Sequence, residues 1–441
     1  MPETAFTAVI LAAGKGTRMQ SALPKVLHEV AGLPMLAHVI AANEAAGARA
    51  VVLVTAPPQE DVRAAADEHS ADIIHVVQPD PRGTGEGVLL ALPHCGDGRV
   101  VNVFGDAPLL RPEIIAELAG ATTAVTVLGF RPDDMATYGR IRMDGDRPAA
   151  IVEFKELAGD DYDLDLCNGG AMGASVEALA ELLPHLTNDN PQGEYLLPHV
   201  VGLASAAGME TSLVMTTPDD TLGVDTRIGL ARAEKLMQSR LRAALLEKGV
   251  SMPDPDSVFL CADTEIAGDV MIEPFVKFGR GVKIGAGSVI KSFSHLEGVS
   301  IGRDVMVGPH ARLRPETHIG DGARIGNFVE IKKARIGAGS KVNHLSYIGD
   351  AELGEDVNIG AGTITCNYDG YRKHTTEIGD GAFIGSNTAL IAPVKIGAGA
   401  YLGSGADVSK DVEADSLVVT RGERRDVAGW AAAFRRRNEK G

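Results

Sequence analysis

Cysteine and positive charge are both scarce in this chain of 441 residues. Its four cysteines form no Cys-x-x-Cys pair and are too few for a disulfide scaffold of this length, so we expect reduced thiols and a cytoplasmic protein. With 59 acidic and 42 basic residues the net charge is −17, which repels nucleic acid and anionic lipid. No apolar run approaches the ~18 residues of a membrane-spanning helix. We therefore expect neither a nucleic-acid nor a membrane partner.

Aromatic residues are also few, at 4% of the chain, whereas glycine is abundant, at 52 residues. Much glycine with few aromatic residues indicates a repetitive, tightly turned architecture. The length predicts roughly two to four domains.

Residues 1–225 alternate short apolar runs with helical patterns. Strands are predicted at 8–11, 51–54, 73–77 and 100–104. Helices are predicted between them, for example at 34–46 and 84–92. This alternation predicts a Rossmann-like α/β domain with a parallel sheet flanked by helices.

One continuous helix is predicted over residues 225–248. Apolar residues recur there at helical spacing, and Gly249 follows as a stop signal. We expect residues 226–249 to form a linker between two domains.

Residues 250–441 have a period of six. An aliphatic residue recurs at every sixth position and is often followed by glycine, as in the series Ile301, Val307, Leu313, Ile319, Ile325 and Ile331. This hexapeptide pattern predicts a parallel β-helix, in which each hexapeptide forms one face of a triangular coil around an aliphatic interior. A polar segment at 365–376 interrupts the repeat, and from Ser409 onward a tail rich in arginine is expected to replace it.

The first candidate site is the loop after the first predicted strand. Gly14 and Gly16 would let backbone N–H groups approach phosphate oxygens, and the loop is expected to lead into the N-terminus of a helix. Lys15, Arg18 and Lys25 would supply cations. The spacing matches neither a Walker loop nor the Rossmann fingerprint, because Gly-x4-Gly-Lys-Ser/Thr and the third glycine are both missing.

A second candidate is Asp106, which follows the strand predicted at 100–104. A carboxylate at the carboxyl edge of a parallel sheet faces the ligand crevice, and beside a nucleotide its natural role is to bind Mg²⁺. An isolated Asp in this position is equally often a simple cap.

Polar residues also occur on the predicted β-helix, where a pure scaffold would not need them. They are Arg314, Lys332, His344 and Asn358, with the loop residues 366–369.

Taken in this order, these features resemble a known family, the bifunctional bacterial N-acetylglucosamine-1-phosphate uridyltransferase/glucosamine-1-phosphate N-acetyltransferases. The resemblance covers nearly the whole chain: a pyrophosphorylase (nucleotidyltransferase) domain, a linking helix, a β-helix and a basic tail. It implies that the β-helix is left-handed. It also implies that the chain acetylates glucosamine 1-phosphate with acetyl-CoA and then couples the resulting N-acetylglucosamine 1-phosphate to UTP.

For the first domain, the resemblance implies that Arg18 and Lys25 are catalytic. Asp106 and Asp225 would bind Mg²⁺, with Asp225 standing where the family usually has Asn. The residues that would bind UTP and the UDP-sugar are Leu11, Ala12, Ala13, Gly14, Lys25, Gln78, Gly83, Thr84, Gly139, Glu153 and Asn168.

For the second domain, the resemblance implies that His344 is the general base that activates the sugar amine. The sugar phosphate would contact Arg314, Lys332, Tyr347 and Asn358. Acetyl-CoA would contact Ala361, Asn367, Tyr368, Ser386, Ser404 and Arg421. The family's acetyl site lies between subunits, which implies a homotrimer.

Two other functions remain open at this point. One is a nucleotidyltransferase with a single activity and a regulatory β-helix, but the joint presence of His344, Asn358 and Asn367 argues against it. The other is an interaction protein of the nucleotide-exchange type, which tends to lose the loop cations that are intact here.

Overall fold

The computed structural model describes residues 5–14, 16–70, 72–135, 137–420, 422 and 425–438. The chain divides into two compact units, Met1–Arg240 and Leu241–Gly441, which are treated separately below. The division falls within helix α7 (Arg227–Glu247), which matches the helix predicted at 225–248 to within two residues at each end. The three-part division at 225/226 and 249/250 stays a prediction.

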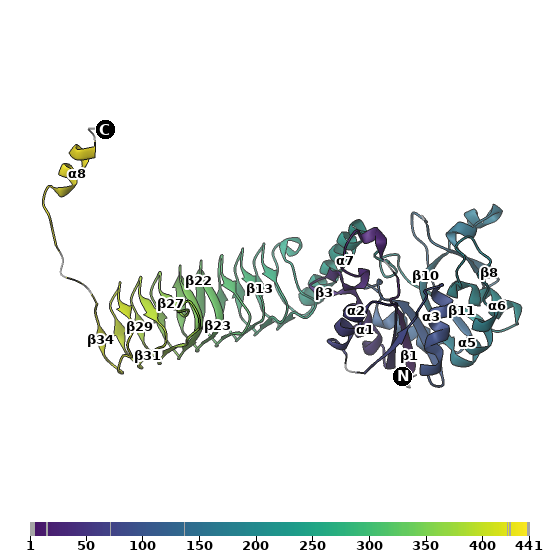
Figure 1. Ribbon diagram of the computed structural model, residues 1–441, viewed down its shortest axis with the longest axis horizontal. Coiled ribbons are helices and arrows are strands. Elements are labelled where there is room, and N and C mark those ends of the chain that lie inside the picture. Colours follow the sequence, from purple (N-terminus) through teal and green to yellow (C-terminus); the bar gives the residue numbers. More distant parts are fainter. Residues whose placement is uncertain are drawn as a thin grey trace. The chain divides into compact units, whose positions relative to one another are not determined.

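The first unit is built on a mixed sheet in the strand order β11-β7-β10-β6-β1-β4-β5 (Figure 1). The strands are β1 (Phe6–Leu11), β4 (Ala48–Thr55), β5 (Ile73–Val77), β6 (Arg99–Phe104), β7 (Val125–Phe130), β10 (Cys167–Ser175) and β11 (Thr211–Met215). The expected parallel arrangement holds for β6-β1-β4-β5 and for β7 with β11, but β10 runs antiparallel to both β6 and β7.

The antiparallel strand has a local cause. The chain reaches β10 from the hairpin β8 (Arg140–Asp144) and β9 (Arg147–Val152) through two 3-10 turns. A parallel crossover would need a longer connection, usually a helix, between the strands. A further short hairpin joins β2 (Glu29–Val30) to β3 (Leu33–Pro34).

Helices cover both faces of this sheet. One buried cluster packs α3 (Thr84–Ala91), α5 (Val176–Leu182) and α6 (Val200–Ala206) against one face. Another packs α1 (Met35–Ala45), α2 (Glu60–Asp67) and α4 (Pro112–Gly120) against the other. Alternate residues of the strands supply the two faces, since Val52 and Val54 belong to the first cluster and Val51 and Leu53 to the second.

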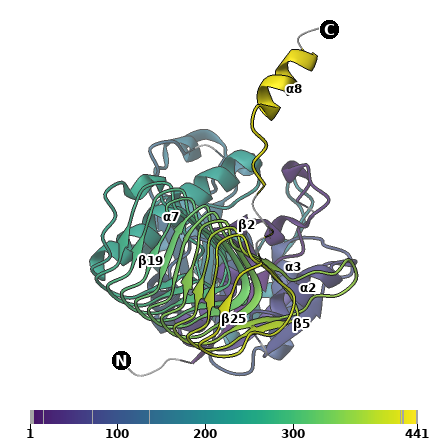
Figure 2. The ribbon, with the colours of Figure 1, turned by 90° about the vertical axis from the view of Figure 1, so that its left-hand side faces the viewer.

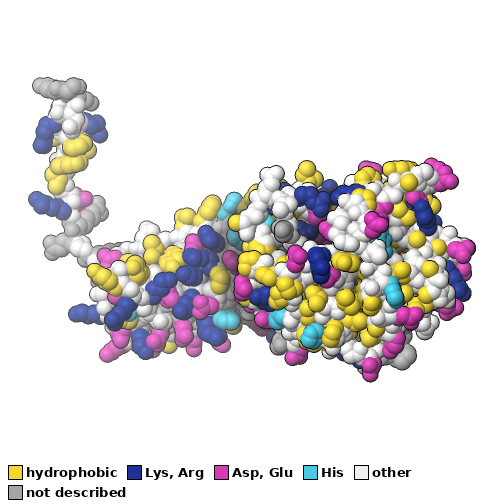
Figure 3. All heavy atoms as spheres, turned by 45° about the vertical axis from the view of Figure 1, so that its right-hand side comes forward, with side chains coloured by type: hydrophobic (Ala, Val, Ile, Leu, Met, Phe, Trp, Pro, Cys, Tyr) yellow, Lys and Arg dark blue, Asp and Glu magenta, His cyan; other side chains and the backbone are white. Residues whose placement is uncertain are grey.

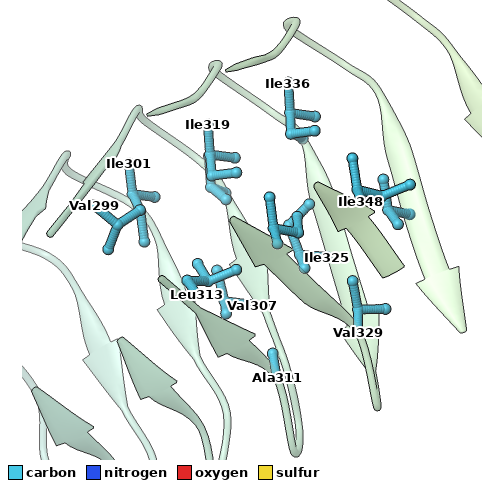
Figure 4. Packing of buried hydrophobic residues seen from close by; sticks show 14 of the residues in the cluster. Val299, Ile301, Val307, Ala311, Leu313, Ile319, Ile325, Val329, Ile336 and Ile348 are labelled. Carbon is cyan, nitrogen blue, oxygen red and sulfur yellow. The ribbon is translucent and has the colours of Figure 1, made fainter. Parts of the chain in front are cut away.

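The second unit is a parallel β-helix, as the hexapeptide period predicts, and Figure 2 shows its coils one behind another. Short strands pair only with equivalent strands of neighbouring coils, so that Ile284 lies beside Ile301 and Ile319 beside Ile336. The side chains of Ile301, Ile319 and Ile336 point into the coil interior, where they stack on one another (Figure 4).

The strands of this unit are β12 (Glu265–Ile266), β13 (Met271–Ile272), β14 (Lys277–Phe278), β15 (Lys283–Ile284), β16 (Val289–Ile290), β17 (His295–Leu296), β18 (Val299–Ile301), β19 (Met306–Val307), β20 (Arg312–Leu313), β21 (Thr317–Ile319), β22 (Arg324–Asn327), β23 (Glu330–Ile336), β24 (Lys341–His344), β25 (Tyr347–Leu353), β26 (Asn358–Ile359), β27 (Ile364–Cys366), β28 (Thr376–Ile378), β29 (Phe383–Ile384), β30 (Ala389–Ile391), β31 (Val394–Ile396), β32 (Tyr401–Leu402), β33 (Asp407–Val408) and β34 (Leu417–Val418).

The β-helix extends beyond the predicted end of the repeat. Val412 pairs with Ile396, and β34 pairs with β32, so the prediction that the repeat ends at Ser409 was wrong. Both Val412 and Val418 pack against the aliphatic interior. The spacing from Val408 to Val412 is four rather than six, which hides the last coil from a search for a strict period.

One corner of the β-helix carries a column of stacked rings. Phe275, Phe293, His310 and Phe328 follow one another with ring centroids 5.2, 4.9 and 5.0 Å apart. Each has a positive φ between 55° and 63°, so the corner needs a left-handed residue that glycine usually supplies. Stacking of the rings offsets part of the strain of that backbone conformation.

The chain ends in the helix α8 (Trp430–Asn438), on which Trp430 stacks on Phe434. Across the described ranges, no helix combines the length and the apolar character needed to cross a bilayer.

A buried aliphatic residue of the β-helix should matter far more than its exposed neighbour. Ile284 is 4% exposed, so we expect Ile284→Ala to lower the free energy of unfolding by about 3 kcal/mol. The neighbouring Lys283→Ala removes only a surface ion pair with Glu265, which is worth less than about 1 kcal/mol. Urea unfolding followed by circular dichroism measures both, and equal effects would contradict the stacking of Ile284 in the interior.

Candidate active sites

The carboxyl end of β1 opens the first site. Leu11 accepts a hydrogen bond from the N–H of Gly105 at 3.0 Å, which joins the loop after β1 to the segment after β6. At Gly16, with φ +59°, an added Cβ would lie 2.6 Å from the Cβ of Lys25, so glycine allows the loop to pack against that lysine. The loop leads into a helix, as predicted, but this is the single 3-10 turn Thr17–Met19. Lys15 lies outside the described residues.

Lys25 stands between two carboxylates. Its Nζ donates to Asp106 and, at 2.9 Å, to Asp225, while Arg18 pairs with Asp225 at 3.0 Å. Asp225 reaches this place because the N–H of Val224 donates to the Asp106 carbonyl at 2.9 Å. Burial acts to lower the pKa of Lys25, but the charges of Asp106 and Asp225 outweigh it, so the pKa is raised and the ammonium stays charged.

The predicted nucleotide residues line one pocket of about 500 Å³. Its lining includes Leu11, Ala12, Ala13, Gly14, Lys25, Gln78, Gly83, Thr84 and Asp106, together with Glu194, which sequence reasoning missed.

Hydrogen bonds fix the far side of this pocket. The buried Gln78 donates to the Gly83 carbonyl at 3.1 Å and to Glu86 at 2.8 Å. Gly83 has φ +127°, and an added Cβ would lie 2.5 Å from the carbonyl oxygen of Tyr195. The segment that carries Glu194 and Tyr195 is therefore closely packed against Gly83, and only the folded structure reveals this.

The predicted sugar residues also come together. The N–H of Asn168 donates to the Gly139 carbonyl at 2.9 Å, and the Asn168 side chain hydrogen-bonds to Glu153. Burial raises the pKa of Glu153, and the nearby Glu156 carboxylate raises it further. Gly170 lies between this group and the pocket. An added Cβ at Gly170 would lie 3.1 Å from the ring of Phe104, which lines that pocket.

The first site has a donor set that fits Mg²⁺. In the described ranges no three His, Cys, Asp or Glu side chains gather into a metal-binding group, so Asp106 and Asp225 are the candidate protein ligands. Mg²⁺ suits such a pair, because it prefers carboxylate oxygens and usually keeps waters and substrate phosphates as its other ligands. Both carboxylates already share one cation, the Lys25 ammonium.

The second site contains a cluster of cations on the β-helix. Lys332 lies beside Lys373, and the contact with Lys373 and the charges of Lys373 and Arg314 lower its pKa. Glu330 pairs with Arg314 at 2.8 Å. Figure 3 shows other basic side chains along the visible face of the β-helix. Like charges held this closely favour a bound anion such as a phosphate.

His344 lies at the end of β24. Its Nδ1 is 2.9 Å from Oδ1 of Asn327, the equivalent residue of the preceding coil. Because an amide oxygen only accepts, this contact favours the neutral tautomer with the proton on Nδ1, in which Nε2 has a free electron pair. Sequence reasoning missed Asn327, which becomes a neighbour of His344 only through the register of the coils.

The side chains of Tyr347 and Asn367 contact each other on the face of the β-helix that carries β25. The amide of Asn367 donates to Asp350 at 2.5 Å and to the hydroxyl of Tyr347 at 3.4 Å. An added Cβ at Gly349 would lie 2.4 Å from that hydroxyl, so glycine makes room for it. Tyr368 is 60% exposed at the start of the polar loop.

Three of the six predicted acetyl-CoA residues form a column. Ala361, Ser386 and Ser404 follow the paired residues Ile359, Ile384 and Leu402 by two positions, and His344 follows Val342 in the same way. The column therefore starts at His344 and continues along successive coils. Asn358 lies on β26 beside Lys341 and Phe383, on a different face from Lys332. Arg421 lies outside the described residues.

Comparison with known proteins places both units in context. Residues 8–140 match a family model described as the MobA-like NTP transferase domain, and residues 298–333 and 375–406 match the bacterial transferase hexapeptide. The chain is 47% identical to the Bifunctional protein GlmU of Azorhizobium caulinodans over 99% of this chain and 98% of that protein. For the GlmU of Parvibaculum lavamentivorans the identity is 49%, over 98% of this chain and 97% of that one.

The chain belongs to the bifunctional GlmU family. Membership confirms the resemblance inferred from the sequence, and the combination of a nucleotidyltransferase unit with a hexapeptide transferase unit confirms a bifunctional transferase. It favours that enzyme over the two alternatives left open above.

Sequence reasoning missed Lys373 as well as Glu194 and Asn327. Asn327 contacts His344, 17 positions further along the sequence, and Lys373 contacts Lys332. Glu194 belongs to the pocket lining because its neighbour Tyr195 is packed against Gly83. The usable signal for Lys373 was its place in the polar segment at 365–376, which the pattern had already marked as exceptional.

The close approach of Gly83 to Tyr195 gives a test of whether this pocket binds a nucleotide. We expect Gly83→Ala to weaken UTP binding at least about tenfold, because the new Cβ displaces the backbone of Tyr195. Gly145→Ala is the matched control, since its φ is also positive, at +63°, and nothing lies within 4 Å of the added Cβ. Titration calorimetry measures both, and equal losses would assign the effect to backbone strain rather than to the approach of Tyr195.

Proposed function

We propose that this chain carries out both reactions of UDP-N-acetylglucosamine synthesis at two separate sites. The C-terminal unit acetylates glucosamine 1-phosphate with acetyl-CoA, and the N-terminal unit couples the product to UTP and releases pyrophosphate. The observation that carries the proposal is that one member of the GlmU family retains both Lys25 between two carboxylates and His344 with a free Nε2.

In uridylyl transfer, a phosphate oxygen of the sugar 1-phosphate attacks the α-phosphorus of UTP. The new P–O bond forms as the bond to the leaving pyrophosphate breaks, and no protein nucleophile is needed. Lys25 and Arg18 neutralise phosphate charge, and the backbone of residues 11–14 faces the triphosphate. Bound Mg²⁺, held by Asp106 and Asp225, would supply further charge neutralisation.

The other side chains of this site position the two substrates. Gln78, Gly83 and Thr84 contact the nucleotide, and Gly139, Glu153 and Asn168 contact the sugar. Two observations support this assignment: the first group lines the pocket, and the second group is hydrogen-bonded together beside it.

In acetyl transfer, the amine of glucosamine 1-phosphate attacks the thioester carbon of acetyl-CoA. Nε2 of His344 takes a proton from the amine, the C–S bond breaks, and CoA leaves as the thiol once its sulfur is protonated. Arg314, Lys332, Tyr347 and Asn358 bind the sugar phosphate, and the geometry adds Lys373 to this set. Ala361, Asn367, Tyr368, Ser386, Ser404 and Arg421 bind acetyl-CoA.

We also propose a homotrimer in the cytoplasm. His344 and Asn358 lie on one face of the β-helix, whereas Lys332 and Tyr347 lie on another. A site divided between two faces is suited to completion by a second copy, which is how the family resemblance implies that the acetyl site is built.

Asp106→Ala should separate the two reactions. We expect pyrophosphate release from N-acetylglucosamine 1-phosphate and UTP to fall at least about a thousandfold, because the variant loses a Mg²⁺ ligand and an anion that holds Lys25. Thiol release from acetyl-CoA and glucosamine 1-phosphate should not change. Asp67→Ala, a carboxylate on the surface of the same unit, is the control, and normal pyrophosphate release by Asp106→Ala would exclude the metal assignment.

His344→Ala should have the opposite effect. Without Nε2 the amine keeps its proton, so we expect thiol release to fall about a hundredfold or more while pyrophosphate release stays normal. His295→Ala, an outward residue of an earlier coil, serves as the control. Full acetylation by the His344 variant would remove this residue from the mechanism.

A further inference from the structure

The segment 193–199 links the two halves of the nucleotidyltransferase site. At one end its backbone is bonded to the nucleotide loop: the N–H of Gly85 donates to the Tyr195 carbonyl at 2.8 Å, and the N–H of Leu197 donates to the Thr84 hydroxyl at 3.0 Å. The N–H of Tyr195 also donates to the Arg82 carbonyl at 2.8 Å. These bonds fix the segment to the residues assigned to the nucleotide.

At its other end the segment reaches the sugar side. His199 closes the 3-10 turn Leu197–His199, and its Nε2 lies 3.0 Å from Oε2 of Glu156. The same Oε2 accepts the backbone N–H of Glu153 at 3.1 Å. One carboxylate oxygen therefore joins the imidazole of His199 to the backbone of Glu153.

Glu153 depends on this support. It begins the short turn Phe154–Glu156, it is half-buried against Gly139 and Asn168, and its carboxyl is repelled by that of Glu156. A proton donor on Glu156 holds the Glu156 carboxylate at the Glu153 backbone and offsets the repulsion. Without that donor, Glu156 is free to turn away and the start of the turn loses its anchor.

We propose that His199 is a positioning residue for the sugar phosphate, acting through Glu156 on Glu153, and that segment 193–199 thereby couples the sugar side of the site to the nucleotide loop. The proposal rests on the function proposed above, in which Glu153 contacts the sugar. His199 itself lines a groove of about 330 Å³ together with His185, Gly202 and Leu203, and this groove is separate from the pocket lined by Lys25 and Gln78.

The main alternative is that His199 only stabilises the fold. Substitutions of its side chain can distinguish this structural role from the positioning role. The side chain of His199 is 27% exposed, whereas its neighbours Leu197 and Val200 are buried. Its ring can therefore be changed without opening a cavity in the interior. Phe keeps the ring but has no donor, whereas Gln places an amide N–H near the position of Nε2.

The experiment measures pyrophosphate release by the full chain with N-acetylglucosamine 1-phosphate, UTP and Mg²⁺, varying each substrate in turn. We expect His199→Phe to raise the KM for the sugar phosphate roughly five- to twentyfold, with kcat and the KM for UTP within about twofold of the unsubstituted chain. His199→Gln should restore the KM for the sugar phosphate. His185→Ala, in the same groove with an exposed side chain, should leave all three constants unchanged.

Two results would overturn the proposal. One is an unchanged KM for the sugar phosphate in His199→Phe; the other is an equal loss in every constant that His199→Gln does not repair, which would indicate a structural role. Glu153→Ala separates this failure from failure of the proposed function. If Glu153→Ala raises the KM for the sugar phosphate and His199→Phe does not, only the role of His199 is excluded.

Discussion

In both units, neighbouring parallel strands are hydrogen-bonded in register, and this pairing brings together residues that are far apart in the sequence at each candidate site. In the first unit, β1 pairs with β6 and β4. Leu11, which ends β1, therefore lies beside Phe104, which ends β6, and the segment after Phe104 begins at the same edge of the sheet. In the second unit, each coil repeats the last at a spacing of ~4.8 Å, which sets Asn327 against His344. A shift of the strand pairing by one residue would turn the aliphatic side chains of the β-helix outward. It would also move Leu11 away from the segment after Phe104 and Asn327 away from His344.

Much of this arrangement can be predicted from the sequence because it is periodic or local. The hexapeptide spacing predicts which residues fill the β-helix, and the loop after the first strand predicts where Gly14 and Lys25 lie. The last coil could not be predicted in this way, because the step to Val412 is shorter than the period. The antiparallel β10 was also missed, since strand direction depends on the connection rather than on the pattern of the strand itself.

The residues that sequence reasoning missed share a physical property. Glu194, Asn327 and Lys373 acquire their roles from neighbours that the fold supplies, such as the approach of Tyr195 to Gly83 or the proximity of Lys373 to Lys332. The chain as a whole carries a net charge of −17, yet Lys332, Lys373 and Arg314 lie close together on the β-helix. There a bound phosphate would meet a local field opposite in sign to the net charge, whereas in the first unit Lys25 and Arg18 are paired with Asp106 and Asp225.

The corner column of stacked rings has a consequence for the acetyl site. Phe275, Phe293, His310 and Phe328 are followed at the same position by Leu345 and then by Gly362, Asn387 and Gly405. The side chains at this corner therefore become smaller in the coils that follow His344. These smaller residues lie next to the column formed by Ala361, Ser386 and Ser404. From His344 to Ser404 is three coil spacings, roughly 14 Å. In the function proposed above, a thioester substrate extended along this column would meet residues spaced in whole coils, so its length would decide which of them it reaches.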